Sequence, residues 1–341
     1  MEKKLFIGID FSKMKVDVTI LEKEHTNETR YSCFSNDESG FEALLNWIKQ
    51  ESDIPSSDWL FCGEDTGLYS IGLSNYLCQR NLFMWLDNSL QIKRSIGLQR
   101  GKNDRLDSKV IAFYAFRFQD RARRYAPKNE TLEALQVLLS FRTRILRNKN
   151  ALLVSAVELR KMRGEDNTTL YVYNQTLADI EQMNKEIKEI EKKMKECIKE
   201  NEEVTRNYTL VTSIKGISLL NAVAILIATN NFTRFNSCRE FACFCGVVPF
   251  ERSSGSSVHG KSQVSRFANI KIKTLLTQAA KCAIVYDNEL KAYYHRKIKE
   301  GKHKNVVINN VRNKLVHRIF AVVRKQEMFD PDYLNKLACA S

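Results

Sequence analysis

The chain has 341 residues, 43% of them hydrophobic, which is enough for real cores and excludes a disordered or fibrous protein. This length favours two domains and a connector over a single core. The net charge of +14 favours a polyanionic partner. From Arg252 to Lys325 the sequence holds 17 Lys and Arg against 3 Asp and Glu, so the rest of the chain is neutral in sum. We expect a nucleic-acid surface in this segment.

The cysteines and the N-terminus indicate a cytoplasmic protein. The nine cysteines form no CxxC motif, and Cys243 and Cys245 are too close in sequence for the usual zinc-ligand spacing. We interpret the thiols as small buried groups in a reducing cytosol. The first ten residues, MEKKLFIGID, lack the apolar region of a signal peptide, and no apolar run reaches ~18 residues. No membrane segment is expected.

The first third of the chain is predicted to be an α/β domain. Short breaks separate the first three strands, which are therefore expected to be antiparallel neighbours. Helices and strands then alternate, beginning with a helix after the start signal Asn36-Asp37. The predicted strands are 4–10, 15–21, 28–34, 59–65 and 81–87, and the later predicted helices are 69–80 and 104–120. This order is expected of an RNase H-like (RuvC-like) sheet, which we assign to residues 1–128.

Residues 129–205 are predicted to form a helical hairpin that connects two domains. Helix formers dominate this stretch, and RGEDNTT at 163–169 interrupts them, so two long antiparallel helices are expected. Apolar residues recur at spacings of three and four, as in the a/d seam of a coiled coil. They are Ile180, Met183, Ile187, Ile190, Met194 and Cys197. The seam is equally compatible with a coiled coil that joins protomers and with an ordinary helix pair inside one chain.

Residues 206–341 are predicted to form an all-α domain. LVTSIKGISLLNAVAILIA at 210–228 has the layout of a helix-hairpin-helix, in which a glycine turn lets backbone N–H groups approach a phosphate. A helix within 235–250 and a Ser/Gly-rich loop at 251–262 follow. The last helices are predicted at 269–285, 287–300 and 304–326.

Four acidic residues of the first domain are placed as metal ligands would be. Asp10 and Glu64 each end an apolar strand, and Asp104 and Asp107 share one face at the start of a helix. In an RNase H-like sheet, the first and fourth strands are neighbours, and the helix after the last strand packs over their ends. The four carboxylates are therefore expected to converge.

Asp65 and Asp17 are the main competitors for these roles. Asp65 falls on the opposite pleat from Glu64, and the alternation of the second strand points Asp17 outward. Taken singly, a strand-end acid is more often a cap or turn residue, and an acidic pair at a helix start complements the helix dipole. The combination of Asp, Glu and Asp-x-x-Asp on these elements favours the metal interpretation.

Converging carboxylates require counter-charge, which hard divalent cations with oxygen ligands supply. We expect Mg²⁺ or Mn²⁺, and two ions about 3.5–4 Å apart could stabilise the attacking and leaving oxygens of a phosphodiester. From Lys93 to Arg124, ten Lys and Arg surround the aspartate pair against three Asp. We interpret them as a basic rim for a phosphate backbone, with Arg100, Lys102 and Arg105 as contacts; the alternative is a solvated helix face.

Four segments, in order along the chain, resemble the DEDD transposases of insertion sequences. They are GIDFSK at 8–13, CGEDTGLYS at 62–70, GLQRGKNDRLDS at 97–108 and GVVPFERSSGSSVHGKSQVS at 246–265. These recombinases pair a RuvC-like domain with a serine-containing transposase domain, and some are guided by a bridge RNA. The resemblance covers nearly the whole chain and implies a DNA transposase.

The resemblance implies metal-ligand roles for Asp10, Glu64, Asp104 and Asp107, and a nucleophile role for Ser254. It implies that this serine attacks a DNA phosphodiester and forms a transient phosphoserine link, which a free DNA hydroxyl later reverses. It also implies homodimers or homotetramers, in which the RuvC-like domain of one protomer meets the serine domain of another. Donor DNA, target DNA and a structured guide RNA are the implied partners.

Basic residues near the serine are expected to contact nucleic acid. Arg252, Lys261 and Arg266 flank the loop, and Lys271 and Lys273 follow it. By composition alone, a Ser/Gly cluster is more often a surface turn. Ser253, Ser256 and Ser257 also lie in this loop, so the choice of Ser254 depends on the family pattern.

Two positions depart from that pattern. Ser108 stands where the family usually has alanine, a change of little expected consequence. The hairpin turn is Lys-Gly-Ile-Ser where a proline and a second glycine are more usual, which weakens the prediction of phosphate binding there. Two other functions stay open: a junction-resolving nuclease that uses water, and a non-catalytic nucleic-acid-binding protein.

Overall fold

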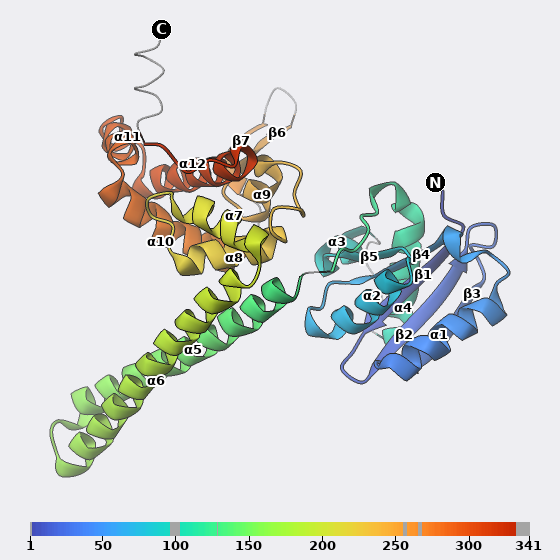
Figure 1. Ribbon diagram of the computed structural model, residues 1–341, viewed down its shortest axis with the longest axis horizontal. Helices are drawn as coiled ribbons and strands as arrows, with labels where there is room; N and C mark the ends of the chain where they lie inside the picture. Colours follow the sequence, from blue (N-terminus) through green and yellow to red (C-terminus); the bar gives the residue numbers. More distant parts are fainter. Residues whose placement is uncertain (1, 96–102, 128, 255–257, 265–267, 332–341) are drawn as a thin grey trace, which may run out of the picture. The chain divides into compact units, whose positions relative to one another are not determined.

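In a computed structural model, the chain divides into two compact units, Met1–Pro127 and Lys128–Ser341 (Figure 1). The structure describes residues 2–95, 103–127, 129–254, 258–264 and 268–331, and for residues 250–254 and 258–263 it describes the backbone alone. No helix within these ranges is long and apolar enough to cross a membrane.

A five-stranded sheet in the order β3-β2-β1-β4-β5 forms the centre of the first unit. The first three strands pair antiparallel, β4 runs parallel to β1, and β5 runs parallel to β4. The strands are β1 (Leu5–Phe11), β2 (Lys15–Glu22), β3 (Thr29–Ser35), β4 (Trp59–Glu64) and β5 (Met84–Asp87). The predicted antiparallel order and the pairing of the first and fourth strands are confirmed.

Helices cover both faces of this sheet, and β1, β2 and β4 are therefore buried along nearly their whole length. On one face, α1 (Glu38–Glu51) and α2 (Leu68–Gln79) share a core with the odd-numbered side chains of β1. On the other, α3 (Ser89–Ser95) and α4 (Asp104–Arg117) pack against Phe6 and the even-numbered side chains of β4. A strand buried on both faces lacks the polar alternation of a half-exposed strand.

The second unit begins with two long antiparallel helices, α5 (Glu130–Arg163) and α6 (Asn167–Lys199) (Figure 1). The predicted turn within 163–169 is confirmed. Buried residues of the seam, Ile187, Ile190 and Met194, pack in one cluster with Leu132 and Leu135 of α5. This packing is that of a helix pair within one chain; a contact between protomers through the hairpin stays a prediction.

The remaining helices surround a second core that includes Phe241, Leu276 and Leu315. They are α7 (Glu202–Thr212), α8 (Leu219–Thr229), α9 (Cys238–Phe244), α10 (Ile270–Tyr286), α11 (Asn288–Lys299) and α12 (Lys304–Lys325). Between α7 and α8, Gly216 has φ +97°, and a Cβ there would lie 2.6 Å from the Ala279 carbonyl oxygen of α10. Backbone conformation and packing therefore both require glycine in this turn, and phosphate binding by the turn stays a prediction.

The all-α prediction for this region is wrong, because a β-hairpin takes the place of the loop predicted at 251–262. Strands β6 (Pro249–Ser254) and β7 (Val258–Val264) pair antiparallel, with an irregularity between Phe250 and Arg252. The Ser/Gly composition correctly indicates a turn. It contains no information on the pairing of the flanking backbone, which requires the two segments to meet along their length.

Candidate active site and nucleic-acid interface

The carboxylates of the first unit lie on the face of the sheet that α4 covers. Asp10 is the sixth residue of β1, and Glu64 ends the parallel neighbour β4, so both lie at the same edge of the sheet. Asp104 and Asp107 lie in the first turn of α4, whose N-cap, Asn103, accepts a hydrogen bond from the Arg105 amide. Residues from three separate elements thus meet at one end of the sheet.

Helix α4 comes unusually close to β1 at Gly8. A Cβ built on Gly8 would lie 2.2 Å from both the Ala112 nitrogen and the Ser108 carbonyl oxygen of the helix. No side chain fits there, so glycine allows the helix backbone to rest directly on the strand. The fully buried Ser108 hydroxyl lies 2.8 Å from that of Thr19 on β2. These two features position Asp104 and Asp107 relative to Asp10.

Mutual repulsion among these acids is visible at Asp10. Burial raises the pKa of Asp10 to about 6, with further increases from Asp107, Glu64, Asp104 and Asp17. The influence of these charges on Asp10 supports the predicted convergence, and the roles of the four residues as metal ligands stay predictions. A cation that binds among these acids would stabilise the charged form of the Asp10 carboxylate.

Asp17 is buried in this group, and the prediction that it points outward is wrong. It pairs with Asp10 across the β1–β2 ladder, so the two side chains share a face. Its side chain is 1% exposed and accepts a 2.5 Å hydrogen bond from the Tyr31 hydroxyl. The prediction failed because it treated β2 as half exposed, whereas α4 covers the face that was assigned to solvent.

Two lysines partly offset the acidic charge. The Lys15 ammonium lies 2.9 Å from Asp17 and 2.8 Å from Asp104, and these hydrogen bonds raise the pKa of Lys15. Lys93 of α3 lies 3.7 Å from Glu64. Sequence reasoning missed Lys15, although its place two residues before Asp17 on one strand puts both on the same face.

Asp87 is a further carboxylate that sequence reasoning missed. It ends β5 beside Glu64, which ends β4. Its oxygens accept hydrogen bonds of 2.7 Å from the Tyr114 hydroxyl and from the Asn88 amide. These two donors hold Asp87 in the local structure of α4 and α3.

Oxygen-only ligands and excess negative charge fit a hard divalent cation. Within the described ranges, no group of three or more Asp, Glu, His or Cys side chains is arranged to hold a metal ion. The ion pairs explain this, because Asp104 faces Lys15 and Glu64 lies near Lys93. Binding an ion would require these carboxylates to turn away from the lysines.

The predicted nucleophile, Ser254, is the last residue of β6, where its backbone pairs with Val258. Its side chain and those of Arg252 and Lys261 lie outside the described residues. Arg100, Lys102 and Arg266 lie outside them entirely. Their predicted roles stay predictions.

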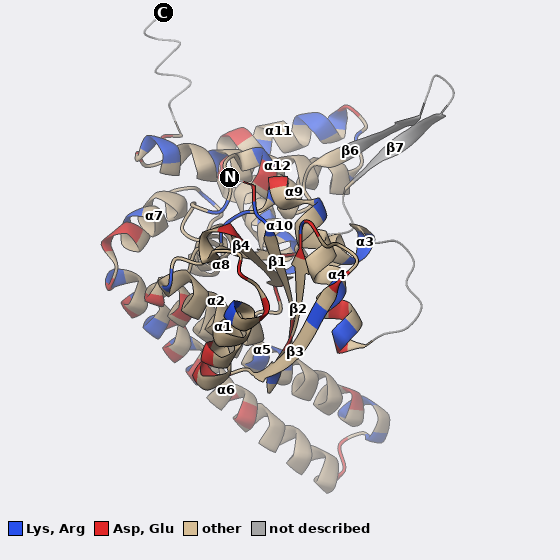
Figure 2. Cartoon of the chain, turned by 90° about the vertical axis from the view of Figure 1, so that its right-hand side faces the viewer, with Lys and Arg blue, Asp and Glu red and all other residues tan. Residues whose placement is uncertain are grey.

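The described cations of the predicted interface differ in their surroundings. Arg105 is exposed at the start of α4, with its guanidinium 5.1 Å from the centre of the Tyr31 ring. Lys271 is exposed on α10, whereas Lys273 is half buried. Figure 2 shows Lys and Arg gathered along α11, which carries Lys291, Arg296, Lys297 and Lys299.

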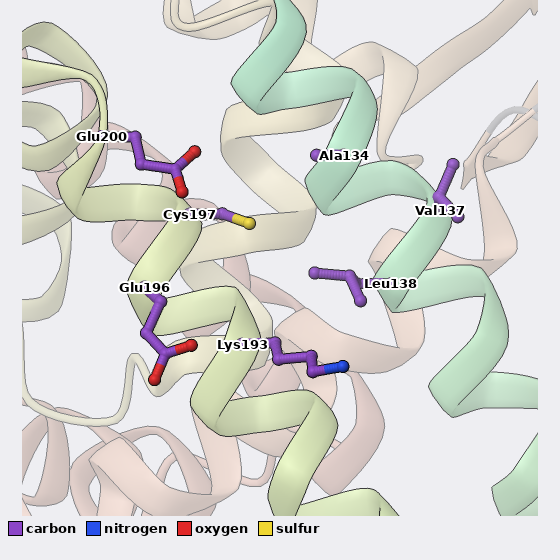
Figure 3. Close-up of a pocket in the computed structure, with 7 residues that line it drawn as sticks. All are labelled: Ala134, Val137, Leu138, Lys193, Glu196, Cys197 and Glu200. Atoms are coloured by element: carbon purple, nitrogen blue, oxygen red, sulfur yellow. The ribbon is translucent and has the colours of Figure 1, made fainter.

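A pocket between α5 and α6 offers no catalytic chemistry. Figure 3 shows its lining of Ala134, Val137, Leu138, Lys193, Glu196, Cys197 and Glu200. Burial raises the pKa of the Cys197 thiol, and the neighbouring Glu200 and Glu196 raise it further. A thiol beside two acids stays protonated and is a poor nucleophile.

Comparison with known proteins identifies the class. A model of DEDD-type IS110 transposases, described as "Transposase", matches residues 7–156, and a model described as "Transposase IS116/IS110/IS902 family" matches residues 208–295. The matches include the sheet with its carboxylates in one case and the serine hairpin in the other, so together they define a transposase or recombinase that acts on DNA. The chain belongs to the IS110 family of transposases.

Curated relatives match along most of their length. A pilin gene-inverting protein of Moraxella bovis is 25% identical over 334 residues, which are 96% of this chain and 98% of the relative. The pilin gene-inverting protein of Moraxella lacunata matches to the same extent. The transposase for insertion sequence element IS1111A of Coxiella burnetii is 24% identical over 264 residues, 68% of this chain and 69% of the relative.

Proposed function

We propose that the chain cleaves and rejoins DNA strands with the help of divalent ions at Asp10, Glu64, Asp104 and Asp107, and with Ser254 as the nucleophile. The observation that carries the proposal is the electrostatic convergence of these carboxylates on Asp10, in a chain of a transposase family. The strand order β3-β2-β1-β4-β5, with α4 packed over β1 and β4, supports an RNase H-like arrangement for this unit.

The residues of the first unit prepare a place for cations. Divalent ions, when bound, would polarise the phosphodiester and stabilise charge on its oxygens. Gly8 lets α4 approach the sheet. Asp10 lies in a partly desolvated position, where its charge interacts more strongly with a nearby ion than it would in water. Lys15 and Lys93 hold Asp104 and Glu64 while no ion is bound.

The serine step conserves the number of phosphate ester bonds. The Ser254 oxygen forms a bond to phosphorus while its proton passes to a base. The P–O bond to one DNA oxygen breaks, and that oxygen takes a proton from an acid or from water and leaves as a hydroxyl. A free DNA hydroxyl then attacks the phosphoserine and releases the serine, so no nucleotide hydrolysis is needed to rejoin strands. Ser254 belongs to a β-hairpin, and rigid elements position a nucleophile better than free loops.

Site-specific inversion is a second outcome of the same chemistry. The relatives from Moraxella are named for inverting a pilin gene and match over nearly their full length. Insertion and inversion both exchange strands between two DNA sites, and differ in how the sites are connected. The basic segment of the second unit would suit DNA, and also a structured guide RNA, whose backbone carries the same charge.

The decisive experiment is a strand-exchange assay with Mg²⁺, donor DNA, target DNA and any RNA encoded beside the gene. Ser254→Ala is expected to lose exchange by about 10³-fold or more while DNA binding persists. Ser253→Ala is the matched control and should retain activity. Exchange that persists in Ser254→Ala would refute the serine mechanism, and cleavage without exchange would indicate a nuclease that uses water.

Asp10→Asn tests the other half of the proposal in the same assay. The substitution keeps the shape of the side chain but removes the charge that a divalent ion would neutralise, so exchange should again fall by about 10³-fold or more. Equal exchange in Asp10→Asn and in the unsubstituted protein would remove the metal role. No exchange in any protein, together with firm DNA binding, would favour a non-catalytic binding protein.

A further inference from the structure

Two arginines of α12 have opposite surroundings. Arg318 is paired with Asp287, at 2.7 Å, and with Glu289, so its charge is balanced by acids of α11 and its N-cap. Arg312, six residues earlier, has no acidic partner among the described residues. Its Nε is buried and makes no hydrogen bond. A guanidinium is seldom left in this state without a reason, because an uncompensated buried charge is costly.

A second cation, Lys273, makes the excess of positive charge around Arg312 larger. Lys273 of α10 is half buried, also without an acidic partner in the described part of the chain. Burial lowers the pKa of Lys273, and the charge of Arg312 lowers it further, so the two cations repel each other. Two adjacent desolvated cations form a site that lacks an anion.

This pair lies at the base of the β6–β7 hairpin. Arg312 donates a 3.1 Å hydrogen bond to the Asn309 side-chain oxygen, and Asn309 donates a 2.7 Å bond to the Val247 carbonyl. The Lys273 ammonium lies 3.7 Å from the position that a Cβ would take on Gly246. Gly246 and Val247 lead directly into β6, whose last residue is Ser254.

We propose that Arg312 and Lys273 form a phosphate-binding pair that holds one backbone phosphate of DNA at the base of the serine hairpin. The inference rests on the proposed function, since it assumes that the strand to be cleaved passes along this hairpin. Arg312 can present its planar fork to two phosphate oxygens, and Lys273 supplies a point charge beside it. The described surroundings contain the donors for such a ligand and no competing acid.

The distance along the hairpin sets the role of the pair. Strand β6 runs five residue steps from Pro249 at the base to Ser254, which corresponds to roughly 17 Å at ~3.3 Å per residue. At ~3.4 Å of rise per nucleotide, the bound phosphate would lie about five nucleotides from the scissile one. Arg312 and Lys273 are therefore positioning residues for DNA.

The test is the affinity of the full chain for a fluorescein-labelled DNA duplex, measured by anisotropy at several salt concentrations in EDTA. Arg312→Gln should weaken binding about 10-fold and reduce the slope of log K against log salt by about one. Arg324→Gln removes an exposed charge from the last turn of the same helix and should cost less than about 2-fold. Equal losses in the two variants would overturn the pair, because they would reflect general charge alone.

Thermal stability without DNA separates ligand binding from a structural role. Arg312→Gln should leave the melting temperature unchanged or raise it, because it removes an unpaired cation. Arg318→Gln should lower it, because Asp287 is 4% exposed and would lose its partner. A large loss of stability in Arg312→Gln with unchanged DNA affinity would overturn the proposal and assign Arg312 to the fold.

An RNA duplex of the same sequence completes the experiment. A loss confined to RNA would overturn the assignment to DNA. If the unsubstituted protein binds DNA but Arg312→Gln binds equally well, this inference fails alone. If the unsubstituted protein binds no DNA at any salt concentration, the proposed function fails together with it.

Discussion

Each unit of the chain contains a local cluster of unbalanced charge, and the two clusters have opposite signs. In the first, Asp10, Asp17, Glu64, Asp104 and Asp107 interact on one face of a sheet, with Lys15 and Lys93 as the lysines that contact them. In the second, Arg312 and Lys273 are half buried and have no acidic partner among the side chains that the structure describes.

Arg318 of the second unit serves as a reference, because its charge is neutralised by Asp287 and Glu289, which accept its hydrogen bonds. The fold can therefore supply counter-charge where an arginine is structural. Where it does not, we propose that a ligand supplies the missing charge: cations for the first unit and phosphate for the second.

The largest expected difference between the two charge clusters is their response to divalent ions. Adding Mn²⁺ to about 100 times its dissociation constant should stabilise the protein by about 2.7 kcal/mol, since the ion binds the folded state alone. Asp10→Asn should abolish this thermal shift, whereas Asp53→Asn, an exposed acid of the same unit, should keep it. An equal rise in melting temperature in both variants would show that the ion binds away from Asp10, and the carboxylate cluster would then not be a cation site.

Acid should stabilise the ion-free first unit, the reverse of ordinary acid denaturation. The pKa of Asp10 is raised from 3.8 to about 6, so the folded chain retains a proton that the unfolded chain releases. Its contribution therefore falls as pH rises from about 4 to about 6, by about 1–2 kcal/mol once solvent screening is allowed for. Denaturant unfolding at several pH values measures this.

Asp10→Asn is the reference for that measurement, because other acids titrate in the same range. The difference in unfolding free energy between the two proteins should change across this pH window and stay flat above it. A constant difference would show that the carboxylates do not interact as the structure has them.

The smallest expected effect is at Ser108, the position where the family usually has alanine. Because its hydroxyl is paired with that of Thr19 in a buried position, Ser108→Ala should cost about 1 kcal/mol. The cost should shrink in a Thr19→Val background, which a double-mutant cycle by denaturant unfolding would show. Additive costs would mean that the two hydroxyls do not fasten α4 to the sheet.

The elements of the first unit were predictable because their signals are local. The strand end at Glu64, the end of β1 one residue after Asp10, and the helix start at Asp104 follow from short apolar runs and capping residues. The hairpin at Ser254 was not predictable in this way, since serine and glycine mark its turn but the pairing of β6 with β7 is a tertiary event. Lys15 was missed and Asp17 was assigned to solvent, because the surroundings of both side chains are set only once α4 covers β2.

The amino-acid sequence by itself determined which residues end strands and start helices, where the long helices turn, and in which segment the positive charge is concentrated. Only the tertiary structure decided that Asp17 faces Asp10 and that Lys15 holds Asp104. It also decided that Arg318 has acidic partners while Arg312 has none within the described part of the chain. The physical reason is that a charge acquires its energy from burial and from neighbours distant in sequence. Residue spacing along the chain contains neither quantity.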